Sequence, residues 1–294
     1  MNWEDQLIQL YCDICDHYHR YLWQFCERFT NNDHPDFSDE EVITIYLFGI
    51  MRKHMTIKAM YDYTRDHLSG WFQHLPSYGG YVQRLNALSP AFQPLLSVLA
   101  PEWLGGSKVN ADFLLDSMPI ILARGSRRFT AKVAPEVADC GYCASKKLSY
   151  YGLKLHVLGI RQPGKLPCPE YLELTSARPH DLTILEQIAP YLRDGRLFAD
   201  KAYVSECLET LLAAQQMQLM TPPKKAKGQE KPRMFEQLLA TSVSRVRQPI
   251  ESFFNWVQEK TGIQIASKVR SLNGLLVHIY GRLAAAMYML NFNS

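Results

Sequence analysis

Residues 109–120 read Val-Asn-Ala-Asp-Phe-Leu-Leu-Asp-Ser-Met-Pro-Ile, and the second aspartate of this stretch is Asp116. Apolar residues dominate the run, which predicts a strand over residues 108–117. Pro119 is expected to end that strand, because proline cannot donate to a strand ladder. A second strand-like run, Leu-Phe-Ala-Asp, ends at Asp200. Two acidic residues that each end a strand are candidates for one shared site.

The chain after residue 105 alternates between strand-like and helical patterns. Further strands are expected at 148–159, 171–174, 196–200 and 218–221. Helices are expected at 181–192, 204–216, 250–260 and 272–290. This alternation predicts a mixed α/β domain over residues 105–294.

The first 104 residues have a helical pattern instead and predict an all-α N-terminal domain, 1–104. One long amphipathic helix is expected from residue 3 to 25, and shorter ones at 57–68 and 78–88. Ser38-Asp39-Glu40-Glu41 has the form of a capping box that opens another helix. Short helices in series suit either a helix-turn-helix module that binds DNA ends or a plain bundle for dimerisation.

Charge is distributed unevenly along the chain. Residues 1–104 hold 7 Lys/Arg and 13 Asp/Glu, a balance of −6, whereas residues 105–294 hold 25 and 16, a balance of +9. The second part therefore has the electrostatic signature of a polyanion binder. The acidic N-terminus lacks a signal-peptide pattern, and the apolar stretch 275–290 contains His278 and Arg282. We therefore expect a cytoplasmic protein without a membrane span.

The seven cysteines include two Cys-x-x-Cys pairs. Cys12 with Cys15 and Cys140 with Cys143 provide four thiolates, enough for a structural zinc site. The alternative is that they are free buried or loop thiols, as is usual in a reducing compartment. The sequence leaves both interpretations open.

A third acidic residue, Glu251, lies in Arg-Val-Arg-Gln-Pro-Ile-Glu-Ser-Phe-Phe, residues 245–254. Pro249 either opens a helix, with Glu251 in its first turn, or lies inside a helix that starts near 242–244. Carboxylates are the natural ligands of two Mg²⁺ (or Mn²⁺) ions that cleave phosphodiesters. Asp116 would bridge the metals, and Asp200 and Glu251 would each complete one.

Each carboxylate also has a structural alternative. Asp200 precedes a short helical run and suits an N-cap. Glu251 suits a surface position on its helix. Asp112 lies four residues before Asp116 on the same strand face and is an alternative ligand.

Several short motifs together resemble the DDE transposases of bacterial insertion sequences, in particular the group around insertion sequence 982. The resemblance covers the chain from about Phe37 onward. The intervals of 84 residues between Asp116 and Asp200 and of 51 between Asp200 and Glu251 support it. The motifs that carry it are residues 75–78 with 84–86, 116–120, 150–156, 178–181, 200–203 and 247–254.

This resemblance implies an RNase H-like catalytic fold that cuts inverted-repeat ends and joins them to target DNA. It also implies double-stranded DNA as partner, a homodimer on that DNA, and a bacterial protein associated with the nucleoid. The family's signature around its final glutamate has a tyrosine and a lysine where this chain has Ser244 and Gln258. Arg247 matches the signature arginine and is expected to contact DNA.

Other basic residues are candidate DNA contacts, with a solvated surface as the structural alternative for each. The segment that joins the first two predicted strands is rich in basic residues. So are residues 222–233, which contain Pro and Gly and are expected to form a loop. The candidates are Arg124, Arg127, Arg128, Lys146, Lys147, Lys154, His156, Lys201, Lys224, Lys225, Lys227 and Lys260. Two rival functions share these features: a catalytically inactive DNA-binding regulator of the element, and a metal-dependent nuclease.

Overall fold

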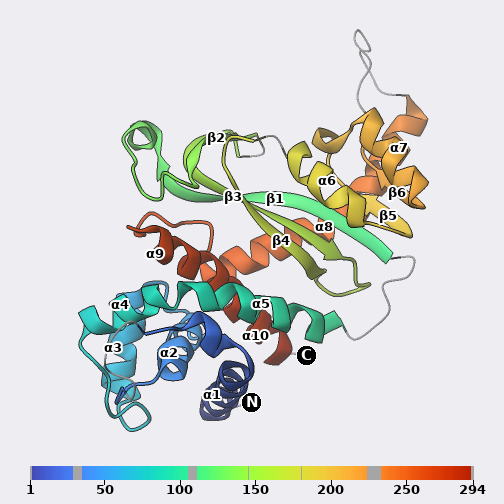
Figure 1. Cartoon of the computed structure of the whole chain (residues 1–294). Helices are drawn as coiled ribbons and strands as arrows, with labels where there is room; N and C mark the ends of the chain where they lie inside the picture. The colour runs from blue at the N-terminus through green and yellow to red at the C-terminus, as the bar shows by residue number, and fades with distance from the viewer. Residues whose placement is uncertain are drawn as a thin grey trace. The chain divides into compact units, whose positions relative to one another are not determined.

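The computed structural model describes residues 2–28, 35–104, 111–144, 146–179, 181–223 and 233–292 (Figure 1). The chain divides into two compact units. The helical unit consists of Met1–Trp103 together with Val257–Ser294, and the sheet unit is Leu104–Trp256.

The helical unit is built around a buried helix, α2 (Asp39–Met51), in which ten of thirteen residues are buried. The predicted capping box opens it: Ser38 Oγ accepts from the Glu41 N–H, and the Glu41 carboxylate accepts from the Ser38 N–H at 2.7 Å. The expected long N-terminal helix is α1 (Trp3–Arg20), which ends earlier than predicted and is followed by a 3-10 turn. The remaining N-terminal helices are α3 (Ile57–His67), α4 (Tyr78–Ala87) and α5 (Ser89–Leu104).

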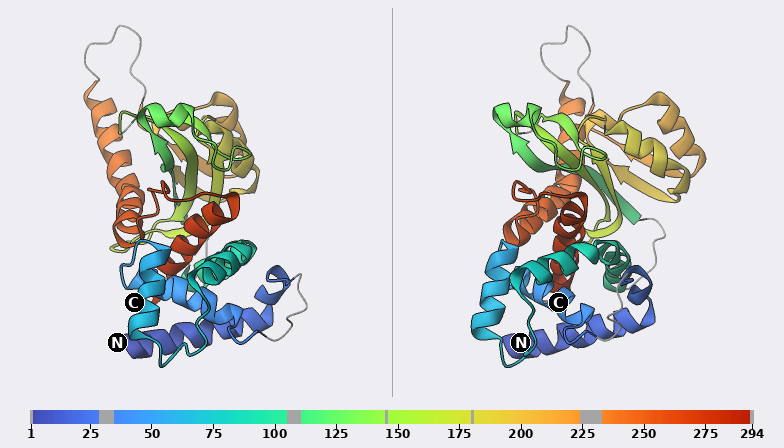
Figure 2. Two further views of the ribbon diagram at one scale, coloured as in Figure 1. Left: turned by 90° about the vertical axis from the view of Figure 1, so that its left-hand side faces the viewer. Right: turned by 60° about the vertical axis from the view of Figure 1, so that its left-hand side comes forward.

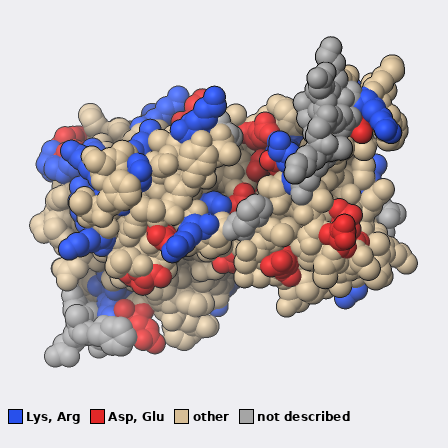
Figure 3. Space-filling view, turned by 90° about the horizontal axis from the view of Figure 1, so that it is seen from above, with Lys and Arg blue, Asp and Glu red and all other residues tan. Residues whose placement is uncertain are grey.

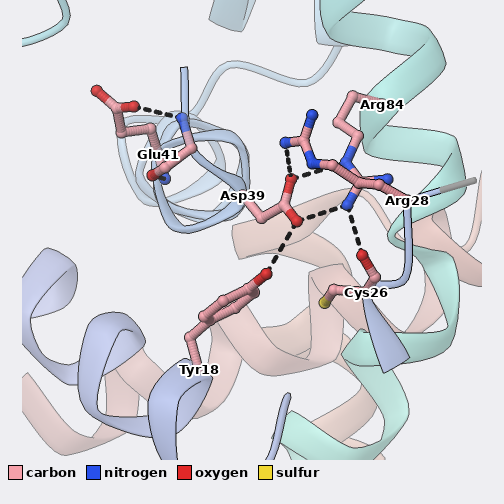
Figure 4. A network of polar contacts seen from close by, with 7 residues as sticks. Tyr18, Cys26, Arg28, Asp39, Glu41 and Arg84 are labelled. Atoms are coloured by element: carbon pink, nitrogen blue, oxygen red, sulfur yellow. Dashed lines mark hydrogen bonds and ion pairs between the residues drawn. The ribbon is translucent and has the colours of Figure 1, made fainter. Parts of the chain in front are cut away.

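Asp39, in the first turn of α2, anchors a buried ion network (Figure 4). Its side chain is 3% exposed and accepts from Arg28 at 2.6 Å, from Arg84 at 2.7 Å and from the Tyr18 hydroxyl at 3.0 Å. Arg84 also donates to the Cys26 carbonyl at 2.7 Å. One carboxylate thus connects α1, α2, α4 and the segment after α1.

The C-terminal helices complete this helical core rather than the sheet unit. They are α9 (Leu272–Leu276), a π-helical turn (Val277–Gly281) and α10 (Arg282–Phe292). The Tyr46 hydroxyl donates to the Val277 carbonyl at 3.2 Å, and a Cβ on Gly281 would lie 2.6 Å from the Tyr46 ring. The predicted 105–294 domain therefore differs from the observed units at its C-terminal end.

One described helical stretch, Leu272–Phe292, is long and apolar enough to cross a membrane, with a mean hydropathy of 1.2. It is 72% buried within the protein. That degree of burial is what a core helix shows, so its composition follows from its place in the helical unit.

The sheet unit holds a mixed six-stranded sheet in the order β2-β3-β1-β5-β6, with β4 paired to β3. β1 is antiparallel to β3 and parallel to β5. The expected strands are present and are joined by one more, β2, inside a segment predicted as a loop. The strands are β1 (Ala111–Arg124), β2 (Asp139–Cys143), β3 (Leu148–Ile160), β4 (Cys168–Ser176), β5 (Gly195–Phe198) and β6 (Met217–Met220).

Pro119 does not end β1, contrary to the prediction. The strand continues to Arg124, with Pro119 opposite Lys154 of β3. β5 pairs with β1 only from Ala111 to Leu114. Beyond Leu114, β1 therefore has no partner strand on the side where β5 lies. A strand that is unpaired on one side tolerates proline.

Helices cover both faces of the sheet (Figure 2). The helices α6 (Leu182–Ile188) and α7 (Glu206–Ala214) pack on the face that carries Phe113 and Leu115. The long helix α8 (Met234–Thr261) runs along the other face, where Ile250 approaches Gly159 of β3. Pro249 lies inside α8, so the helix starts well before it, and Glu251 is not in a first turn.

Candidate functional site

Asp116 lies in β1, and Asp200 follows the end of the neighbouring parallel strand, β5. Leu114 of β1 pairs with Phe198, the last residue of β5, so each aspartate lies two residues beyond this pair. The Asp116 side chain points to the face that α8 covers, because Arg247 of α8 donates to it. The Asp200 carboxylate also accepts from the Lys201 N–H at 2.7 Å and caps the short 3-10 turn Lys201–Tyr203. A capping role and a place beside Asp116 are thus compatible.

Arg247 connects the third acid to the first. Arg247 Nη1 donates to Asp116 Oδ2 at 2.7 Å, and Nη2 donates to Glu251 Oε1 one helical turn farther along α8. The side chains of Asp116 and Arg247 are 21% and 16% exposed, and that of Glu251 is 49% exposed. The guanidinium therefore lies between two of the three predicted ligands.

The pKa of Asp116 reflects its burial and the charges of its neighbours. Burial raises the pKa of Asp116 to about 6, although the Arg247 charge and the Ser117 N–H act to lower that pKa. The charges of Glu251 and Asp200 raise it further. Both other acids thus act electrostatically on Asp116, so the site brings together three residues that are far apart in the sequence.

The donor chemistry of this site fits divalent metal ions, because three carboxylates supply hard oxygen ligands. In the described part of the chain, however, no three His, Cys, Asp or Glu side chains are grouped closely enough to hold an ion. Arg247 occupies the space between Asp116 and Glu251 instead. The alternative ligand Asp112 is engaged elsewhere, by Arg196 at 2.7 Å and Arg161 at 3.5 Å.

The cysteines give no indication of a zinc site. None of the seven is in a disulfide bond. Cys12 and Cys15 belong to α1 of the helical unit, whereas Cys140 and Cys143 belong to β2 of the sheet unit. The described residues contain no group of three metal-ligating side chains that includes any of them.

Lys154 and His156 lie on the sheet face away from Asp116, because they pair with Pro119 and Ser117 in the β1–β3 register. Lys154 Nζ donates to the Pro179 carbonyl at 2.7 Å and to Asp181 at 2.8 Å. His156 is 1% exposed, and its Nε2 lies 2.9 Å from Thr175 Oγ1. In this arrangement, therefore, His156 is not exposed to DNA, and Lys154 is occupied by an ion pair.

Burial also determines the charge of His156. It lowers the pKa of the imidazole to about 4, against a smaller raising effect of Asp181. The ring is therefore neutral at physiological pH and has the properties of a core residue.

Two neighbours of the site were not predicted from the sequence. Asp181 precedes α6 but does not cap it; its carboxylate accepts instead from Lys154 and from the Ser117 hydroxyl at 3.2 Å. The Tyr203 hydroxyl is buried without a hydrogen-bond partner among the described residues. Burial, followed by the charges of Asp181, Asp116 and Asp200, raises its pKa. The motif Arg-Pro-His-Asp, residues 178–181, was the available signal for Asp181. His180 lies outside the described residues.

The basic segment between β1 and β3 forms an exposed end of the sheet unit. It contains a 3-10 turn, Gly125–Phe129, and β2. Phe129 and Tyr142 are 72% and 58% exposed, and the Arg128 guanidinium lies 4.2 Å from the Phe129 ring centroid. Figure 3 shows basic side chains gathered on this part of the surface. The basic residues of the segment are Arg124, Arg127, Arg128, Lys132, Lys146 and Lys147.

The remaining residues predicted to contact DNA lie outside this basic segment. Lys201 is exposed beside Asp200. Lys260 lies in the part of α8 that belongs to the helical unit and pairs with Glu259 at 3.3 Å. Gln258, which replaces the signature lysine, accepts from the Gln264 N–H at 2.7 Å after α8 ends. Lys224, Lys225 and Lys227 lie outside the described residues.

A comparison with protein families gives a match to residues 107–271, more than half of the chain, for the family described as a transposase DDE domain. The matched range includes Asp116, Asp200 and Glu251. No curated protein and no solved structure matches the chain. The family implies an RNase H-like fold, and the curled mixed sheet with helices on both faces agrees with it.

Proposed function

The chain belongs to the transposase DDE domain family, and from this premise we propose that it cuts DNA at the inverted-repeat ends of an insertion sequence and joins those ends to target DNA. The observation that carries the proposal is that Arg247 pairs with both Asp116 and Glu251, while the charges of Glu251 and Asp200 both act on Asp116. The three acids are the proposed catalytic residues. Together they are the proposed ligands of two Mg²⁺ or Mn²⁺ ions.

Transposases of this family generally use divalent metal ions. When bound, such ions would stabilise the attacking and the leaving oxygen of the phosphodiester exchange. The protein's contribution is to position the ligands: Asp116 in β1, Asp200 just after the neighbouring strand β5, and Glu251 on α8. Burial raises the pKa of Asp116 in the metal-free site to about 6, so protons should compete with metal ions for this carboxylate as pH falls below that value.

The DNA backbone would be held mainly by the exposed basic segment between β1 and β3. Phosphate contacts from Arg124, Arg127 and their neighbours are independent of sequence and sensitive to salt. The exposed rings of Phe129 and Tyr142 are suited to stacking on bases that are unpaired at a cleaved end. Lys201 and Arg247 would contact the strand at the acids themselves. Lys224, Lys225 and Lys227 are further proposed DNA contacts, on the basis of the sequence alone.

Joining two ends in one reaction requires two active sites, so we propose a homodimer on DNA. A relationship to the group around insertion sequence 982 would place the protein in the bacterial cytoplasm, associated with the nucleoid. Either DNA contact or dimerisation remains a proposed role for the N-terminal helices.

The test is a Mg²⁺- or Mn²⁺-dependent cleavage and strand-transfer assay on duplexes that carry the element's inverted repeats. Asp116→Asn, Asp200→Asn and Glu251→Gln should each abolish cleavage and joining. Glu259→Gln, an exposed change on the same helix as Glu251, should retain activity. Activity that survives all three acid variants would contradict the mechanism. Nicks without joined products would favour the nuclease, and specific binding without cleavage would favour the regulator.

A further inference from the structure

Arg247 has an unusual set of partners for a residue expected to bind DNA. Its two terminal nitrogens are both used by carboxylates, Asp116 and Glu251. Its third nitrogen, Nε, is buried and has no hydrogen-bond partner in the described part of the chain. One guanidinium therefore neutralises two of the three proposed metal ligands, and does so from inside the site.

We propose that Arg247 is an internal counter-ion that keeps Asp116 and Glu251 from binding metal until a DNA phosphate draws the guanidinium away. Metal binding is then coupled to DNA binding through this one side chain. The inference rests on the proposed function, because it takes the two acids as metal ligands and DNA as the substrate.

The first argument is competition for the same oxygens. A carboxylate oxygen that accepts a charge-assisted hydrogen bond has its lone pairs directed at the guanidinium. Asp116 Oδ2 and Glu251 Oε1 are both in this state. This explains why the described residues contain no group arranged to hold an ion, although three acids converge.

The second argument concerns what can release the guanidinium. Arginine binds phosphate oxygens in the same bidentate way as it binds carboxylates, so a DNA phosphate is a direct competitor. The buried Nε supplies a third donor that no group among the described residues satisfies. Because Arg247 and Glu251 are one turn apart on α8, a change of side-chain rotamer is enough to separate them.

The coupling must act in both directions. If DNA increases the affinity for metal by some factor, metal increases the affinity for DNA by the same factor. Coupling factors of roughly 5–150-fold are typical, and two displaced hydrogen bonds make about tenfold a reasonable expectation here. In this scheme the acids bind metal tightly only when DNA is in place, which restricts cleavage to bound ends.

The experiment measures Mn²⁺ binding to the full chain by electron paramagnetic resonance of the free ion, with and without an inverted-repeat duplex. Mn²⁺ bound by the duplex alone is subtracted. Arg247→Gln should bind Mn²⁺ about tenfold tighter than wild type without DNA, and DNA should no longer increase its affinity. Arg247→Lys keeps the charge but cannot bridge both acids, so its affinity should lie between the two. Arg245→Gln, an exposed change on the same helix, should match wild type.

The outcomes separate the inference from the proposed function. Equal Mn²⁺ affinity of wild type and Arg247→Gln without DNA overturns the inference. So does a wild-type affinity in Arg247→Lys, because the hydrogen bonds of the guanidinium to both carboxylates would then not compete with the metal ion. This variant suffices if Arg247→Gln does not fold. Asp116→Asn should lose Mn²⁺ in every case. If Asp116→Asn binds Mn²⁺ as wild type does, Asp116 is not a ligand of the metal ion. That result would contradict both the proposed function and the inference.

Discussion

The ammonium of Lys154 and the carboxylate of Asp181 form an ion pair at 2.8 Å, on the face of the sheet opposite to Asp116. Both groups are mostly buried, with side chains 14% and 25% exposed. The pair joins β3 to the start of α6, and Asp181 extends it to β1 through Ser117. The pair therefore holds β1, the strand that carries Asp116, from the opposite face of the sheet.

Lys154→Met should therefore reduce stability rather than DNA affinity. Methionine retains the apolar stem of the side chain but leaves Asp181 without its cation. Breaking a buried pair costs about 3–5 kcal/mol, and partial exposure reduces this to about 1–3 kcal/mol. Urea unfolding measures the loss, with exposed Lys165→Met as a control of unchanged stability. A large fall in DNA affinity at unchanged stability would indicate instead that Lys154 contacts DNA.

Asp116→Asn should stabilise the metal-free fold at alkaline pH. Because the folded-state pKa of Asp116 is raised from 3.8 to about 6, its contribution to stability is fully present below pH 3.8 and is lost as pH rises through about 6. Each pKa unit corresponds to about 1.4 kcal/mol, and solvent screening reduces the net gain to about 1–2 kcal/mol. Thermal unfolding in EDTA should show the gain at pH 8 and none at pH 4. A variant less stable than wild type at pH 8 would contradict the prediction.

Arg127→Ala should weaken DNA binding by a salt-dependent amount. Arg127 is exposed in the 3-10 turn after β1, where a phosphate can reach it. Loss of one phosphate contact should weaken binding to all sequences similarly and reduce the slope of log affinity against log salt by about 1. Titrations at several salt concentrations measure that slope. Arg193→Ala, exposed elsewhere in the sheet unit, serves as the control, and equal slopes for the two variants would place DNA away from this segment.

Asp39→Asn should destabilise the helical unit. Asparagine keeps the shape but leaves the guanidiniums of Arg28 and Arg84 without their counter-charge. The expected cost is about 3–5 kcal/mol, as for other buried pairs that lose one partner. Circular dichroism during urea unfolding measures this cost. Exposed Asp36→Asn is the matched control, and equal midpoints for the two variants would show that the network contributes little.

Local patterns predicted most elements of the fold. The capping box at Ser38, the strand that leads to Asp116 and the short strand before Asp200 all follow from nearest neighbours in the sequence. β2 did not, because Asp139–Cys143 has no apolar alternation and becomes a strand only by pairing with β3. The start of α8 at Met234 was also missed. The sequence left open whether Pro249 opens a helix or lies inside one that starts near 242–244; Pro249 lies inside α8, fifteen residues after its first residue.

The candidate site was predictable as a set of residues but not as an arrangement. Alternation along β3 puts Lys154 and His156 on one face, but both faces of this sheet are covered by helices. Alternation cannot distinguish a covered polar face from an open one. The ion pairs of Arg247 depend on the packing of α8 against β1, which no local pattern encodes.

The contact between Tyr46 and Val277 spans 231 residues of the chain, and it has a consequence for synthesis. While the ribosome is producing the sheet unit, the N-terminal helices have no α9 or α10 to cover Tyr46 and Phe92. Their core closes only after the last helices emerge. A premature stop codon after Glu251 would therefore spare all three acids and still leave the first hundred residues without a finished core.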